Sequence, residues 1–153
     1  MKKNDKLFCV VNLFSIIAQI QHESNKQMSK KVKYTLEYPV RCSPGILYEF
    51  LSTPSGLQEW FADKVDEEDG VFTFSWNGAI EEAEVMQSEE NKSIRFHWLN
   101  SPKDEYFEFC IEKSEVTNLT ILIVNDFADK KEIKDQSQLW ETQVKDLFYR
   151  LGN

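Results

Sequence analysis

The 153-residue chain lacks most of the residue patterns that build catalytic or metal centres. Its three cysteines, Cys9, Cys42 and Cys110, are far apart and form no Cys-x-x-Cys spacing, so they predict neither a zinc site nor a disulfide framework. We expect free thiols in a reducing compartment, and therefore a cytoplasmic protein. With only His22 and His97, the sequence supports neither a Ser-His-Asp nor a Cys-His arrangement.

Glycine and positive charge are also scarce. None of the five glycines falls in a G-x-G-x-x-G run, so no phosphate-binding loop and no cofactor are indicated. From Val32 onward, 12 Lys and Arg face 24 Asp and Glu, and the net charge of the whole chain is −8. A body this acidic repels phosphate backbones and anionic membrane surfaces, which excludes nucleic acid as a favoured partner.

No apolar run has the length of a membrane span. The longest, residues 7–20, is too short and is interrupted by Asn12. Its basic start resembles a signal peptide without a clear cleavage site, whereas Met28 followed by lysines reads like an ordinary start. We predict that residues 1–27 are a leader outside the fold, with an over-extended start, a signal or anchor, and an accessory helix as open alternatives. The folded domain is predicted over residues 32–152.

The folded part begins with a strand and two short helices. Residues 32–38 alternate between apolar and polar side chains, as a half-buried strand does, and Pro39 is expected to end it. Ser43-Pro44 and Thr53-Pro54 then repeat one signal, a hydroxyl cap before a proline at the first helical position. Each predicted helix is about two turns long, too short to persist without packing on something larger.

Six further antiparallel strands are predicted next. Asp69-Gly70 and Asn77-Gly78 are strong hairpin turns, and the second pairs Phe74 with Glu81. A four-residue turn over 89–92 then pairs Val85 with Phe96. Residues 136–153 end the chain with an amphipathic helix of about five turns. The predicted fold is α+β: a curved seven-stranded antiparallel sheet on a long C-terminal helix, with two short helices after the first strand.

The run from Pro44 to Ala62, P-x-x-L-Y-E-x-L-x-T-P-x-G-L-x-x-W-F-A, resembles the START-like, or SRPBCC helix-grip, superfamily. The branch it most resembles contains the activators of chaperone ATPases, the AHSA type. The resemblance covers roughly residues 32–151. It implies a cup between the sheet and the last helix, with the short helices near the mouth. Members carry lipids, bind or cyclise polyketides, or assist chaperones, so the resemblance leaves the function open.

The candidate site is the aromatic face of the sheet. On the functional interpretation it lines a pocket for an apolar or aromatic molecule; the alternative is that the rings fill the cup and leave no cavity. The predicted ligand-binding residues are Phe72, Phe74, Trp76, Glu81, Phe96, Trp98, Phe107, Phe109, Trp140 and Phe148. No catalytic or metal-binding residue is predicted.

Three other features have simpler explanations. Glu81 faces inward and could be an acid, a base or a polar anchor, but we expect it at a wet rim because burying an unpaired charge is costly. His97 is expected on the outer face, in a surface ion pair beside Glu82 and Glu84. Trp60 and Phe61 are expected to anchor the second helix in the core rather than to gate a ligand.

Three functions follow from these expectations. The first is a small cytoplasmic module that binds an apolar or lipid-like small molecule in the cup. The second is a protein-interaction or co-chaperone-like module with a filled core. A polyketide cyclase-like enzyme ranks last, since Glu81 is its one inward ionisable group, and an enzyme is not favoured overall. The predicted partners are therefore a hydrophobic small molecule or a protein, without a membrane span.

Overall fold

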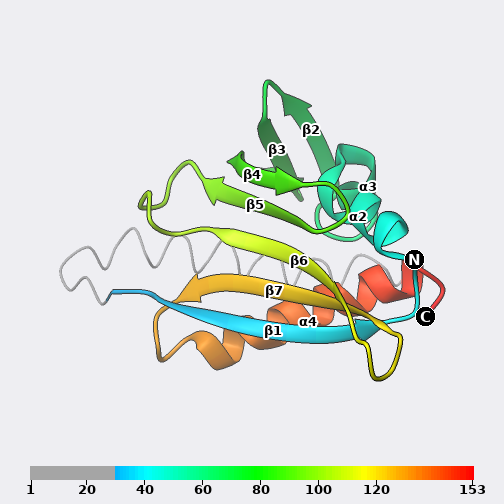
Figure 1. Cartoon of the computed structure of the whole chain (residues 1–153). Helices are drawn as coiled ribbons and strands as arrows, with labels where there is room; N and C mark the ends of the chain where they lie inside the picture. The colour runs from blue at the N-terminus through cyan, green and yellow to red at the C-terminus, as the bar shows by residue number, and fades with distance from the viewer. Residues whose placement is uncertain (1–29) are drawn as a thin grey trace.

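The computed structural model describes residues 30–153, which form one curved antiparallel sheet and three helices (Figure 1). The strand order is β1-β7-β6-β5-β4-β3-β2, so β1 and β2 are the two edges. The predicted α+β helix-grip architecture is confirmed, while the predicted leader over 1–27 lies outside the described residues. The strands are β1 (Val32–Val40), β2 (Lys64–Glu68), β3 (Val71–Trp76), β4 (Ala79–Glu89), β5 (Ser93–Trp98), β6 (Phe107–Lys113) and β7 (Thr120–Ala128). The helices are α2 (Pro44–Ser52), α3 (Pro54–Gln58) and α4 (Ile133–Arg150).

Both short helices begin as predicted. Ser43 accepts a hydrogen bond from the backbone N–H of Ile46 at 3.3 Å, and Thr53 accepts one from Gly56 at 3.0 Å. A hydroxyl at each N-cap satisfies a backbone donor that the helix itself cannot satisfy. With five residues, α3 is shorter than the predicted two turns. The chain ends α3 early because it turns to bring Trp60 and Phe61 into the core.

The hairpins follow the predicted register with one correction. Asp69-Gly70 and Asn77-Gly78 have positive φ at both positions, and Phe74 lies opposite Glu81 as expected. Val85 also lies opposite Phe96, but the turn before β5 holds three residues, because Glu89 already pairs with Ser93. A bulge between Val85 and Gln87 absorbs the extra residue, which keeps the inward face apolar.

The first strand continues past the predicted stop. Pro39 lies within β1 and faces Ile121 of β7, and the strand ends at Val40. Proline removes a backbone donor, which β1 tolerates because no other strand of residues 30–153 pairs with its second side. The edge position of β1 was not evident from the sequence, and the prediction that Pro39 ends the strand was wrong for that reason.

The final helix lies across the concave face of the sheet near β1 and β7 (Figure 1). It buries Leu139, Trp140, Val144 and Leu147, a stripe with the 3.6-residue period of an amphipathic helix. Its C-terminal end lies near α3, where Arg150 and Glu59 form an ion pair at 3.6 Å. Within residues 30–153, no helix has both the length and the apolar character that crossing a membrane requires.

Candidate functional site

The aromatic face of the sheet forms one continuous cluster of touching rings. Phe96 stacks on Phe107 with ring centroids 4.9 Å apart, and Trp98 stacks on Phe107 at 4.8 Å. Phe74 contacts Phe96 edge-on at 6.3 Å. These separations are those of aromatic pairs in direct contact, so no ligand-sized gap separates the rings along the sheet.

Phe61 covers the cluster on the side that faces α4. It follows α3 and lies between sheet and helix, stacked on Phe107 at 5.9 Å and on Trp140 at 6.0 Å. It also meets Phe74 edge-on at 5.1 Å, and it is buried. Phe61 therefore occupies the space in which a ligand held between the sheet and α4 would lie. The prediction that Trp60 and Phe61 anchor the core is consistent with this burial.

The structure brings most of the predicted site residues together. Six of the rings are buried against one another in the cluster, and Trp140 meets them from α4. Trp98 and Phe148 are partly buried, and Phe148 contacts Tyr38 of β1 at 6.4 Å. Glu81 is half-exposed, and its hydrogen-bond partner is the amide of Asn100, at 3.5 Å. Glu81 thus lies at the rim. The six buried sheet rings are Phe72, Phe74, Trp76, Phe96, Phe107 and Phe109.

His97 does not form the predicted surface ion pair. It is buried, and its Nδ1–H donates to the backbone carbonyl oxygen of Glu105 at 2.8 Å. The loop between β5 and β6 passes over this part of the outer face and supplies that carbonyl. A strand-by-strand register does not show which loop folds back over the sheet, so the burial of His97 was not predictable from alternation.

A second polar arrangement joins the outer faces of four strands. Arg95 forms an ion pair with Glu108 at 2.9 Å and lies 4.0 Å from the centre of the Tyr106 ring. Asn125 donates to Glu108 at 2.9 Å and accepts from the hydroxyl of Thr35 at 2.7 Å. Each buried polar atom in this chain of contacts has a partner, so the arrangement stabilises the sheet. It leaves no buried donor or acceptor free to bind another molecule.

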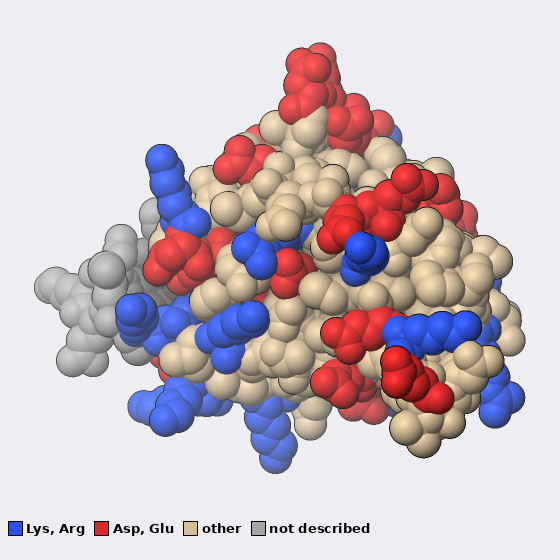
Figure 2. Space-filling model, in the orientation of Figure 1, with Lys and Arg blue, Asp and Glu red and all other residues tan. Residues whose placement is uncertain are grey.

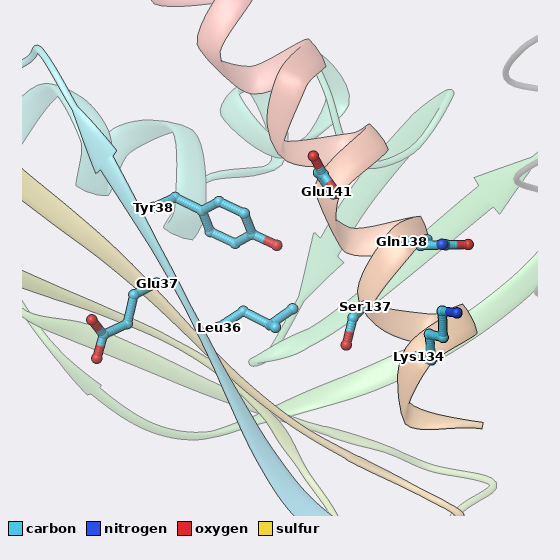
Figure 3. A pocket seen from close by; sticks show the side chains of 7 residues that line it. All are labelled: Leu36, Glu37, Tyr38, Lys134, Ser137, Gln138 and Glu141. Carbon is cyan, nitrogen blue, oxygen red and sulfur yellow. The ribbon is translucent and has the colours of Figure 1, made fainter. Parts of the chain in front are cut away.

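An open groove of about 460 Å³ lies between β1 and α4, away from the ring cluster (Figure 3). Figure 3 shows Leu36 and Tyr38 pointing from β1 toward the helix, whereas Glu37 points to the other side. Burial and the nearby Glu141 carboxylate raise the pKa of Tyr38, so its hydroxyl stays protonated. The lining residues are Leu36, Glu37, Tyr38, Lys134, Ser137, Gln138 and Glu141.

Asp126 is the ionisable group of this region that sequence reasoning missed. It faces inward from β7, and its Oδ2 accepts from Trp140 Nε1–H at 2.8 Å and from the Tyr34 hydroxyl at 3.2 Å. Its Oδ1 accepts from the backbone N–H of Phe127 at 2.7 Å. Burial raises the pKa of Asp126 to about 6, although these donors lower it. The same burial, followed by the charge of Asp126, raises the pKa of Tyr34.

The alternation of β7 held the signal for Asp126. Leu122, Val124 and Asp126 share one face, so the strand pattern places a carboxylate inward. Its partners come from β1 and α4, which are 92 and 14 residues away. Only the packing of α4 against the sheet shows that donors surround it.

The described residues offer little for metal chemistry. Among residues 30–153, no three His, Cys, Asp or Glu side chains come together as ligands for a metal ion. Burial and the charge of Glu108 raise the pKa of the Cys110 thiol to about 11, and burial raises that of Cys42. Both are therefore thiols, not thiolates, at neutral pH and are poor nucleophiles.

The curved sheet, the crossover helices and the long helix define a helix-grip protein. The family model of the START-like superfamily domain matches residues 28–153, and the chain belongs to that superfamily. A Bacteroides fragilis protein solved in solution by NMR is 36% identical, with a TM-score of 0.60 over 78% of this chain and 90% of that one. No curated protein matches the chain significantly.

More distant structures share the fold. The Aha1 dimer from Colwellia psychrerythraea is 20% identical, with a TM-score of 0.60 over 78% of this chain and 92% of that one. DynU16, from the dynemicin biosynthetic locus, is 17% identical, with a TM-score of 0.67 over 79% of this chain and 47% of that one. At these identities the likeness concerns architecture alone.

Proposed function

We propose that this chain is a protein-interaction module of the START-like superfamily whose cup is filled by its own aromatic side chains. The observation that carries the proposal is the position of Phe61, stacked between Phe107 and Trp140. A ligand in the same place would have to displace a buried ring from close-packed neighbours. The likeness to Aha1 agrees with this proposal but adds only the fold.

The outer face of β4, together with the first residue of the loop after β5, is the surface that fits a protein partner best. Ile80 is 64% exposed and Leu99 is 44% exposed, and Leu99 lies opposite Glu82, two residues from Ile80 on the same side of β4. Glu84 continues this face. Figure 2 shows that acidic side chains also gather over the nearby β2–β3 hairpin, at the top of the view. A partner segment with apolar and basic side chains complements such a surface.

A photo-crosslinking experiment tests this surface. A benzoylphenylalanine in place of Ile80 should trap one reproducible partner in cells, and the same residue in place of Val116 should not. Val116, on the loop between β6 and β7, is 95% exposed, so an absence of trapping there would not result from poor accessibility. Trapping should weaken when Glu82 is changed to Lys. Equal trapping at both positions, or none at Ile80, would refute the proposed surface.

A second candidate function, binding of a small apolar molecule, is favoured by one buried atom. Gln143 lies on the sheet-facing side of α4, and its Oε1 is buried with no hydrogen-bond partner among the described residues. A ligand donor could satisfy that oxygen if the ring cluster opened. Native mass spectrometry of freshly purified protein decides between the two: a bound small molecule favours this candidate, and a bare chain favours the filled cup.

A further inference from the structure

The two edges of the sheet differ in how they are protected from pairing with other strands. The edge strand β2 has five residues, of which Asp66, Glu67 and Glu68 are acidic, and short length and repeated charge both discourage added strands. The other edge strand, β1, has nine residues and pairs only with β7 within the described chain. Over its length it carries one lysine and one glutamate, so its charges balance.

The inward side of β1 is incompletely covered as well. Leu36 and Tyr38 are only half-buried, whereas Leu122 and Val124 on the adjacent β7 are fully buried. The open groove between β1 and α4 lies over the two half-buried side chains. A long unpaired edge next to partly exposed apolar side chains is a surface that another strand can cover.

From these observations we infer that β1 pairs antiparallel with β1 of a second copy of this chain, about a two-fold axis through Thr35. In this register Lys33 of each copy lies opposite Glu37 of the other, which makes two Lys–Glu cross-strand pairs. Thr35 lies opposite Thr35 of the second copy, another favourable cross-strand pair. The charge pattern of the outward face, Lys33–Thr35–Glu37, is therefore complementary to itself when reversed.

The inward face fits the same arrangement. Tyr34 lies opposite Leu36 of the second copy, so each strand adds apolar side chains to the face next to the groove. Pro39 has no backbone N–H, so the ladder is expected to extend over residues 33–37 and to end before it. The contact is isologous, with the same strand used by both copies, and so it closes as a dimer rather than growing into a fibre.

Sedimentation velocity of the full chain tests the inference, since the dimer has twice the 18.0 kDa mass of one chain. We expect a monomer–dimer equilibrium that depends on protein concentration, with a dissociation constant below about 100 µM, as small interfaces can give. Lys33→Glu or Glu37→Lys alone should weaken dimerisation at least about tenfold, because each places like charges opposite one another twice. Mixing the two single variants should restore a dimer, since both glutamates of the first variant's strand then face lysines of the second variant's strand.

The restored heterodimer separates pairing from a folding defect, because a misfolded variant would not recover on mixing. Lys64→Glu on the other edge strand is the matched control and should leave dimerisation unchanged. A wild-type chain that stays monomeric, or single variants that dimerise like the wild type, would overturn the inference. So would a dimer that forms only after removal of residues 1–27, since the full chain would then not use this edge.

Discussion

The two halves of the space between sheet and helix are packed in opposite ways. Toward β2–β6, Phe61 fills the cup, and its ring contacts are continuous from Trp76 to Trp140. Toward β1, the groove stays open, and the inward side chains are half-buried around the ionisable Asp126. The comparison teaches that the space between the sheet and α4 can be close-packed by rings in one half while the margin beside β1 stays open. We expect mutations in the filled half to lower the free energy of unfolding. Changes at the margin, the open groove beside β1, should instead alter the pH dependence of stability or the association of two copies.

The largest effect is expected at Phe61. Phe61→Ala should lower the free energy of unfolding by about 3–5 kcal/mol, because it removes a buried ring and leaves a cavity. Urea unfolding measures the loss. The variant should also bind small apolar probes such as indole, which the wild type should not, since an empty apolar cavity admits them.

Tyr149→Ala is the control for Phe61→Ala, because Tyr149 is 74% exposed on the far side of α4. Its cost should stay within about 0.5 kcal/mol. Equal losses for the two variants, or indole binding by the wild type, would show that the cup is not filled as described.

At the margin, Asp126 should make stability depend on pH. Its folded pKa of about 6 lies above the ordinary 3.8, so its contribution is fully present below pH 4 and is lost as pH rises through 6. The loss should be about 3 kcal/mol across that window. Denaturant titrations at several pH values should show it as a difference between wild type and Asp126→Asn.

Trp140→Phe sharpens the same test. It keeps a large ring but removes the Nε1–H that donates to Asp126 and lowers its pKa. The midpoint of the pH-dependent loss should therefore move above 6 in this variant. A wild-type and Asp126→Asn pair with parallel pH profiles would mean that Asp126 is solvated like a surface carboxylate.

The next effect tests how tightly α2 and α3 pack in the filled half. A Cβ at Gly56 would overlap with the backbone carbonyl of Glu49 in α2. Gly56→Ala should therefore cost about 2 kcal/mol or more, since the two helices must separate. Gly45→Ala is the paired control, because its Cβ would meet only the side chain of Asn91, at 3.6 Å. That change should be neutral or slightly stabilising in thermal unfolding.

The smallest effect concerns the helix caps. Ser43→Ala and Thr53→Ala should each cost about 1 kcal/mol, since each leaves a backbone donor unsatisfied. The Thr53 hydroxyl also donates to the carbonyl of Glu49 at 2.7 Å, so its loss should be the larger. Thermal unfolding resolves the difference; a reversed order would mean that the link between α2 and α3 contributes little.

Much of the fold was predictable because its signals are local. The Asn77-Gly78 turn fixed the pairing of Phe74 with Glu81, and alternation then assigned the inward rings. The bulge before Gln87 was not predictable, because a bulge leaves alternation intact on both sides of it. Of the candidate site, the ring cluster was predicted as a set. The filling by Phe61 could not be, since it depends on where the chain after α3 meets the sheet and α4.

The sequence by itself determined which side chains turn inward and where helices and hairpins begin, because periodicity, caps and turn residues act over a few positions. The tertiary structure alone decided that Phe61 fills the cup, that Asp126 meets donors from β1 and α4, and that β1 is an edge strand whose only partner among residues 30–153 is β7. Those outcomes depend on contacts between residues tens of positions apart, and close packing, burial and charge pairing are properties of the assembled layers.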